Sequence, residues 1–292
     1  MLGHFCADGR REKSGENPYS ISGDTFIVFL VEGAASLSAV IPVSSLSSAP
    51  HLREKTLRIA QLLRSASIFR VKDILFYSDT GKEEEKEVGT IVRYLMLPPY
   101  LKKSFPITDA TRYVGVAPPI KTPLHTASRD VKAALAEPVR QAVVTHDAAL
   151  VDAGLGSHLP FYALSAHRRG ELVYIRVERH GRELAARELH PSEIRVYTGP
   201  SVHFVKASDI LTYDRTFTRV ELTRQGTFFG DLRTLKGSGY LLFVGDQERD
   251  PHEFITENFD LRVNLVRKQG VETVRSEEAF LIALSQFSLC TG

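Results

Sequence analysis

Apolar positions along the chain alternate between two kinds of spacing, one typical of buried strands and one typical of amphipathic helices. Short apolar or β-branched runs at Asp73–Tyr77, Thr218–Thr223 and Tyr240–Val244 predict strands. Longer segments at residues 52–67 and around Val88–Tyr94 predict helices. Because strands and helices alternate, we expect an α/β fold with a parallel sheet and helices on both of its faces.

The last thirty residues predict a loop, a short strand, a second loop and a helix. Ser276 can cap this helix, and Glu277 and Glu278 would lie in its first turn, where the helix dipole favours negative charge. Apolar side chains then recur at helical spacing, at Phe280, Ala283, Leu284 and Phe287. An ordinary terminal α/β unit accounts for this order, but it leaves the polar string from Glu272 to Glu278 unexplained.

The pattern changes between about residues 124 and 200. Arg140–Val144 and Glu171–Val177 alternate or are β-branched, and glycine-containing turns lie between such segments. This predicts a small inserted β-barrel that resembles an OB-fold, a class that binds single-stranded nucleic acid or proteins. Basic and acidic residues nearly balance there, so the charge of the barrel alone does not favour RNA.

The beginning of the chain carries no comparable pattern. The apolar run Thr25–Leu30 is too short to span a bilayer, and the acidic residues before it are untypical of a signal peptide, so we expect a buried strand. We expect no membrane segment and a cytoplasmic location. The predicted division is an N-terminal extension (1–35), an α/β domain (36–123 and 201–292) and the inserted barrel (124–200).

Charge and cysteine content limit the kinds of partner and of structural site that we expect. Residues 51–72 hold six basic side chains against one acidic one, and residues 92–140 hold eight against three. Charge runs are commonly solvated faces, but two basic blocks in a chain of net charge +2 favour a polyanionic partner. Cys6 and Cys290 lie near opposite ends of the chain, so we expect neither a disulfide framework nor a metal site.

Five segments resemble, in the same order, motifs of one family. The string Thr273–Ala279 resembles Thr-(Ile/Val)-Arg-Thr-Glu-Glu-Ala, and residues 63–77 resemble an Arg-Ala-x-x-Ile-Phe-x-Val motif followed by a strand. The family is that of the archaeal and eukaryotic SPOUT-type RNA methyltransferases, to which methylation of uridine in ribosomal RNA is attributed. The resembling segments are residues 37–46, 63–77, 94–105, 114–125 and 264–289.

The resemblance implies a C-terminal trefoil knot in which S-adenosylmethionine binds bent, held largely by backbone groups of three loops. It also implies a structured, ribosomal RNA substrate. It further implies a homodimer to which the last helix contributes, and Phe280, Leu284 and Phe287 offer an apolar face for it. The residues of the matching cofactor loops are Thr223, Gly245, Asn264, Gln269, Gly270 and Thr273.

Three residues are candidates for the chemistry. Arg64 matches the functional arginine of SpoU-type enzymes, and it could stabilise charge as a uridine loses its N3 proton or simply contact phosphate. An arginine cannot be the base itself. Arg275 and Glu278 match the C-terminal motif, where they could orient the target base or form a structural ion pair or cap. The candidates for RNA contact are Arg53, Lys102, Lys103, Lys121 and His125.

The chain also departs from the family pattern. The loop Phe243–Pro251 lacks a glycine and a Gly-Leu pair, the loop Asn264–Gln269 lacks Thr, Pro and Gly, and Arg267 and Lys268 stand where adenine should pack. Glycines let a backbone approach a ligand closely, so their loss could abolish cofactor binding. Two hypotheses follow: an S-adenosylmethionine-dependent RNA methyltransferase, or a catalytically inactive SPOUT-fold protein that binds RNA or the ribosome.

Overall fold

The computed structural model describes residues 35–290 apart from residues 146–147, 229–231, 233–234, 236 and 257. Cys6 and the predicted strand Thr25–Leu30 lie outside these residues. Within the described part, no helix is long and apolar enough to cross a membrane.

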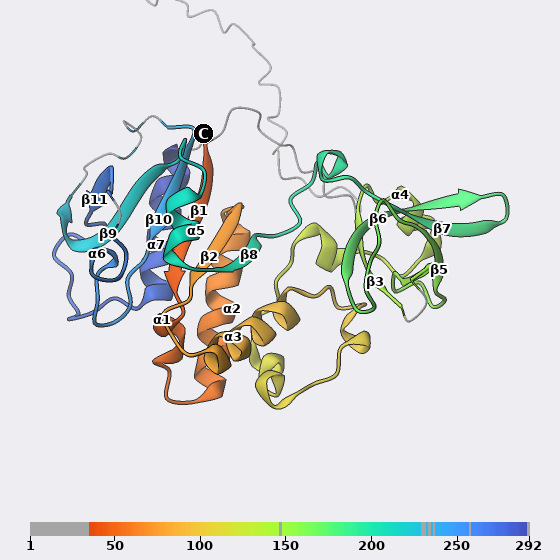
Figure 1. The fold of residues 1–292 in the computed structure, drawn as a ribbon, viewed down its shortest axis with the longest axis horizontal. Coiled ribbons are helices and arrows are strands. Elements are labelled where there is room, and N and C mark those ends of the chain that lie inside the picture. Colours follow the sequence, from red (N-terminus) through yellow and green to blue (C-terminus); the bar gives the residue numbers. More distant parts are fainter. Residues whose placement is uncertain are drawn as a thin grey trace, which may run out of the picture.

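Six strands form one sheet in the order β11–β9–β10–β1–β2–β8, and every neighbouring pair is parallel (Figure 1). In the middle of the sheet, Ala39 of β1 pairs with Ile74 of β2 and with Leu242 of β10. Since the strands are parallel, the loops that follow them all begin at the same edge of the sheet. The strands are β1 (Ser36–Pro42), β2 (Asp73–Tyr77), β8 (Ser201–Val205), β9 (Thr218–Thr227), β10 (Gly239–Phe243) and β11 (Leu261–Val263).

Helices cover both faces of the sheet, as predicted. One face packs on α2, α3 and α7, and the other packs on the short helices α5 and α6. Alternate residues of β1 divide between the two faces, so Ile41 belongs to the first core and Val40 to the second. The helices are α1 (Ser44–Ser47), α2 (Leu52–Ile68), α3 (Lys82–Met96), α5 (Ala207–Thr212), α6 (Pro251–Phe254) and α7 (Ser276–Phe287).

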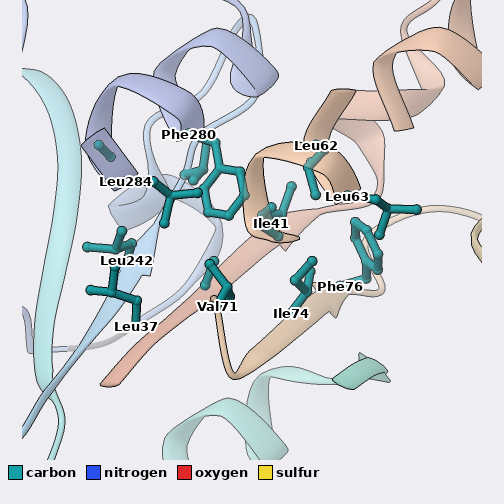
Figure 2. Close-up of a cluster of buried hydrophobic side chains, with 14 of the residues drawn as sticks. Leu37, Ile41, Leu62, Leu63, Val71, Ile74, Phe76, Leu242, Phe280 and Leu284 are labelled. Atoms are coloured by element: carbon teal, nitrogen blue, oxygen red, sulfur yellow. The ribbon is translucent and has the colours of Figure 1, made fainter. Parts of the chain in front are cut away.

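The C-terminal helix α7 is buried within its own chain. Figure 2 shows Phe280 and Leu284 directed toward side chains of α2, β1 and β10, among them Leu62, Ile41 and Leu242. Phe280, Leu284 and Phe287 are each fully buried. The expectation that these three side chains leave an apolar face for a second subunit is therefore wrong, because α2 and the sheet already cover it. The homodimer itself stays a prediction.

The predicted barrel is a closed barrel of five strands in the order β3–β4–β5–β7–β6 (Figure 1). The pair β5–β7 is parallel and the other pairs are antiparallel. Ala134 of α4 (Val131–Ala136) packs into its core. The strands are β3 (Arg140–Val144), β4 (Leu150–Asp152), β5 (Leu159–Tyr162), β6 (Leu172–His180) and β7 (Glu183–Glu188).

Tyr100 joins the segment after α3 to the barrel. Its hydroxyl donates to the carbonyl of Gln141 at 2.9 Å, and the buried guanidinium of Arg140 lies 4.4 Å from the centre of its ring. A Cβ on Gly154 would lie 2.4 Å from the Tyr100 ring, and the φ of Gly154 is +75°, so this contact requires glycine. The barrel is thereby fixed to the segment that continues from α3.

We predict that Phe280→Ala lowers the free energy of unfolding by about 3–5 kcal/mol, because it leaves a cavity between α7, α2 and the sheet. Urea denaturation followed by circular dichroism measures this. Leu289→Ala is the control: Leu289 is 60% exposed, so its truncation should change stability by less than about 0.5 kcal/mol. Equal effects of the two substitutions would contradict the burial of α7 described above.

Candidate functional site

A cavity of about 370 Å³ lies at the carboxyl edge of the sheet, where the loops after β9, β10 and β11 meet the start of α7. Its apolar wall includes Leu222, Val244, Val263 and Leu265. Of the residues that the sequence assigned to the cofactor loops, Gly270 does not line the cavity. Those that do are Thr223, Gly245, Asn264, Gln269 and Thr273.

The side chains of these loop residues hold the loops together. The Thr223 hydroxyl donates to Asp250 at 2.6 Å. Asn264 donates to the carbonyl of Arg224 at 2.9 Å and accepts from the backbone N–H of Val266 at 3.0 Å. Because the Thr223 and Asn264 side chains are already bonded to the protein, these two residues offer a ligand mainly their backbone groups.

The loop after β10 is closed by Asp246 instead of by the glycines of the family pattern. One carboxylate oxygen of Asp246 accepts from the backbone N–H groups of Glu248 and Arg249, at 2.9 and 2.7 Å. A Cβ on Gly245 would lie 2.5 Å from the Arg249 carbonyl oxygen, so this tight turn still requires glycine at its first position. Burial by itself would raise the pKa of Asp246, but the hydrogen bonds from Glu248 and Arg249 outweigh it and lower the pKa.

Arg249 connects this loop to the ends of two further strands. Its Nη2 lies 2.7 Å from Asp79 and 2.6 Å from Asp246, and it donates to the Ser44 hydroxyl at 3.1 Å. Asp79 in turn accepts from the Ser44 backbone N–H and hydroxyl at 2.9 and 2.6 Å. No motif in the sequence identified these residues. Their common signal is that Ser44, Asp79 and Asp246 follow three different strands by two or three residues.

The two cations of the last loop do not obstruct the cavity. Neither Arg267 nor Lys268 lines it. The Arg267 guanidinium lies 5.4 Å from the ring centre of Phe228, and Lys268 has a φ of +55°. The departures from the family pattern in this loop therefore leave the cavity open.

None of the three candidate catalytic residues lines the cavity. Glu278 accepts from the backbone N–H of Arg275 at 3.0 Å, so this pair caps α7. The expectation that Ser276 is the cap is wrong, because Arg275 is the N-cap and the Ser276 hydroxyl donates to the Gly245 carbonyl at 2.8 Å. Arg64, near the end of α2, donates to the Pro119 carbonyl at 2.7 Å. The catalytic roles of Arg64, Arg275 and Glu278 stay predictions.

The candidate RNA-binding residues are in different environments. Arg53 and Lys121 are exposed, and Lys103 lies 3.3 Å from Asp152. The Lys102 ammonium lies 5.3 Å from the ring centre of Tyr94, and burial lowers its pKa. In the described part of the chain, no cluster of three His, Cys, Asp or Glu side chains could hold a metal ion.

His125 is half-buried. Its Nδ1 lies 2.8 Å from the Thr122 hydroxyl. Burial and the nearby charge of Lys102 lower the pKa of His125 to about 4. The imidazole is neutral at neutral pH and would bring no positive charge to RNA, and the contact of His125 with RNA stays a prediction.

Several known proteins are similar to this chain. The model of the family described as "Putative RNA methyltransferase" matches residues 36–224, so the chain belongs to this family of RNA methyltransferases. An uncharacterized protein of Haloarcula marismortui is 28% identical over 288 residues, which cover 86% of this chain and 98% of that protein. The 28S rRNA (uridine-N(3))-methyltransferase of Drosophila melanogaster is 23% identical over 310 residues, which cover 86% of this chain and 61% of that protein.

Solved structures of rRNA and SpoU methyltransferases are also similar. One is an AdoMet-bound rRNA methyltransferase from Sinorhizobium meliloti, with a TM-score of 0.38 and 9% identity over 88% of this chain and 56% of that chain. Another is a SpoU methyltransferase from Streptomyces viridochromogenes in complex with AdoMet, with a TM-score of 0.37 and 8% identity over 88% of this chain and 57% of that chain.

We predict that the protein loses stability as the pH falls from 6.5 to 4. The folded-state pKa of His125, about 4, lies below its ordinary value of 6.5, so between these values the unfolded chain binds the proton more readily. This contribution is complete above pH 6.5 and is lost as the pH falls toward 4, by up to about 3 kcal/mol. His125→Asn should flatten the dependence measured by urea denaturation, whereas His158→Asn, at an exposed position, should not.

Proposed function

We propose that the protein transfers a methyl group from S-adenosylmethionine to a uridine base nitrogen of structured RNA, with ribosomal RNA as the substrate. The observation that carries this proposal is the cavity between the loops after β9, β10 and β11 in a chain of the RNA methyltransferase family. The named activity of the Drosophila relative supports the choice of uridine in ribosomal RNA.

The residues of the cavity fit S-adenosylmethionine. A volume of about 370 Å³ is within the range of small-molecule sites. Leu222, Val244 and Val263 would cover the faces of adenine, and backbone groups of the loop after β11 would bind its edge. Asp250 and Glu253 place negative charge in the wall of the cavity, which suits the ribose hydroxyls and the positively charged sulfonium. When bound, the cofactor supplies an electrophilic methyl group.

We assign proton removal from the base nitrogen to Glu248. It lines the cavity, and in the described part of the chain its carboxylate accepts no hydrogen bond. The other acids at this edge are already bonded: Asp246 and Asp79 pair with Arg249, and Glu253 accepts from the backbone N–H of Asp250 at 2.6 Å. A carboxylate free to approach the substrate can act as a general base.

The barrel supports a nucleic-acid substrate. A closed five-stranded barrel is the architecture of OB-folds, which bind oligonucleotides. We propose that this barrel is OB-like and contacts RNA outside the cofactor cavity.

We also propose that the protein forms a homodimer and is located in the cytoplasm. Light scattering at micromolar concentration would argue against the dimer if it found monomer alone.

We predict that S-adenosylmethionine and its demethylated product bind the protein in calorimetry. At one hundred times the dissociation constant, either ligand should raise the free energy of unfolding by about 2.7 kcal/mol. Val266→Trp should abolish binding because it fills the cavity, whereas Val271→Trp should not, because Val271 is 61% exposed and does not line it. RNA binding without any cofactor binding at millimolar ligand would favour the non-catalytic hypothesis.

We predict that Glu248→Gln lowers the rate of methyl transfer by about 10²–10⁴-fold, because a neutral amide cannot accept the proton of the base. Transfer of radioactive methyl from S-adenosylmethionine to ribosomal RNA measures this rate. Cofactor affinity should stay within a few-fold of the unsubstituted protein. Gln247→Ala is the matched control from the same loop, and a similar loss of rate in that variant would remove the assignment to Glu248.

A further inference from the structure

A second cavity, also of about 370 Å³, lies where the barrel meets the sheet. Its walls come from α3, from β3 and β6 of the barrel, and from β8 with the residues before it. Strand β8 forms the edge of the sheet opposite β11, so this cavity is separate from the one at β9, β10 and β11. The proposed cofactor binding and methyl transfer do not involve this second cavity.

Most of its wall is apolar and contains a fixed aromatic ring. Val92, Met96, Leu172 and Phe204 line the cavity. The Phe204 ring stacks on Phe76, with ring centres 5.3 Å apart and planes inclined by 27°. An apolar slot beside a held aromatic ring suits a flat, unsaturated ring.

Gln141 brings an unpaired acceptor to this slot. Its side-chain oxygen is buried and has no hydrogen-bond partner in the described part of the chain, and Gln141 lines the cavity. The backbone of Gln141 is held in place by the Tyr100 hydroxyl, which donates to the Gln141 carbonyl at 2.9 Å and accepts from the Gln141 N–H at 3.2 Å. Buried acceptors without a partner are uncommon, because burial removes the hydrogen bond to water and nothing replaces it. This oxygen therefore indicates a ligand with an N–H donor.

Arg93 places a positive charge on the same cavity. Its side chain is exposed, Nη2 donates to the Gly170 carbonyl of the barrel at 2.8 Å, and the guanidinium lies 5.2 Å from the ring centre of Phe105. The guanidinium is therefore held between the barrel and the segment after α3, with further N–H groups available for an anion.

We infer that this cavity binds a nucleobase of the RNA that has left its stack. An N–H of the base donates to the Gln141 side-chain oxygen, its ring lies against the wall that contains Phe204, and its phosphate contacts Arg93. The inference rests on the proposed function for RNA as the partner, and it adds an anchor for a nucleotide other than the one that is methylated. Uracil and guanine carry a ring N–H, and adenine, guanine and cytosine carry an exocyclic amino group, so each could supply the donor; cytosine is the smallest base with an amino group.

Calorimetry with cytidine 5′-monophosphate, which lacks the adenine of the cofactor, tests this inference. We expect binding at millimolar or lower concentration and a loss of affinity of at least about tenfold in Gln141→Leu. The 5′-phosphate of 2-pyrimidinone riboside, which is cytidine without its amino group, should bind as weakly to the unsubstituted protein. Thr198→Trp, in the loop before β8, fills the cavity without altering a strand and should abolish binding even if Gln141→Leu fails to fold.

The controls separate this inference from the proposed function. Val266→Trp blocks the other cavity, so cytidine monophosphate should bind that variant as it binds the unsubstituted protein. Loss of its binding in Val266→Trp would place the nucleotide in the cofactor cavity and overturn the inference. Absence of binding at millimolar concentration, or unchanged binding in Thr198→Trp, would do the same. None of these outcomes depends on whether S-adenosylmethionine binds or methyl transfer occurs.

Discussion

The packing of α7 against α2 and the middle of the sheet is the interaction on which the proposed cofactor cavity depends. β11 lies at one edge of the sheet, whereas Phe280 and Leu284 are buried over β1 and β10. The chain between β11 and α7 must therefore cross the ends of β9 and β10, and this crossing forms a wall of the cavity. The bond from Ser276 to the Gly245 carbonyl then fixes the first turn of α7 to the loop after β10. Packing in the core thus positions the two loops that line the cavity.

A network of charged hydrogen bonds also orders the loops at this edge of the sheet. Arg249 joins the loops after β1, β2 and β10 through Ser44, Asp79 and Asp246. The carboxylates of Asp79 and Asp246 are only 6% and 10% exposed, and the cation between them gives both a charged hydrogen-bond partner. A loop closed in this way is ordered before a ligand arrives, which lowers the entropy lost on binding. In the loop after β10, the hydrogen bonds of Asp246 and Arg249 stand where the family pattern has glycines, and the cavity beside this loop is open.

Local pattern in the sequence was sufficient for most elements, because strand and helix periods depend on neighbouring residues. Asp73–Tyr77 and Arg140–Val144 are strands with the predicted bounds, and the helix predicted at residues 52–67 ends one residue later. The errors concern contacts between distant segments. Serine is a favoured residue at helix N-caps, but the Ser276 hydroxyl donates instead to the carbonyl of Gly245, 31 residues earlier. No local pattern could show that a single arginine would join three loops, or that Gln141 would line a cavity together with α3.

The two cavities constrain how an RNA could lie on the protein. Three strand spacings separate β10, at the cofactor cavity, from β8, at the second cavity, which amounts to about 14 Å across the sheet. One nucleotide cannot fill both sites, so the base proposed to bind at Gln141 and the base proposed to reach Glu248 must belong to different positions of the RNA. Both bases must be unstacked, and stacking and pairing oppose this in a regular RNA helix. A loop or bulge, whose bases are already partly free, meets this requirement at lower cost than a duplex. The two proposed sites therefore favour a structured RNA that presents unpaired nucleotides, one to be held between the barrel and α3 and another to be methylated at the carboxyl edge of the sheet.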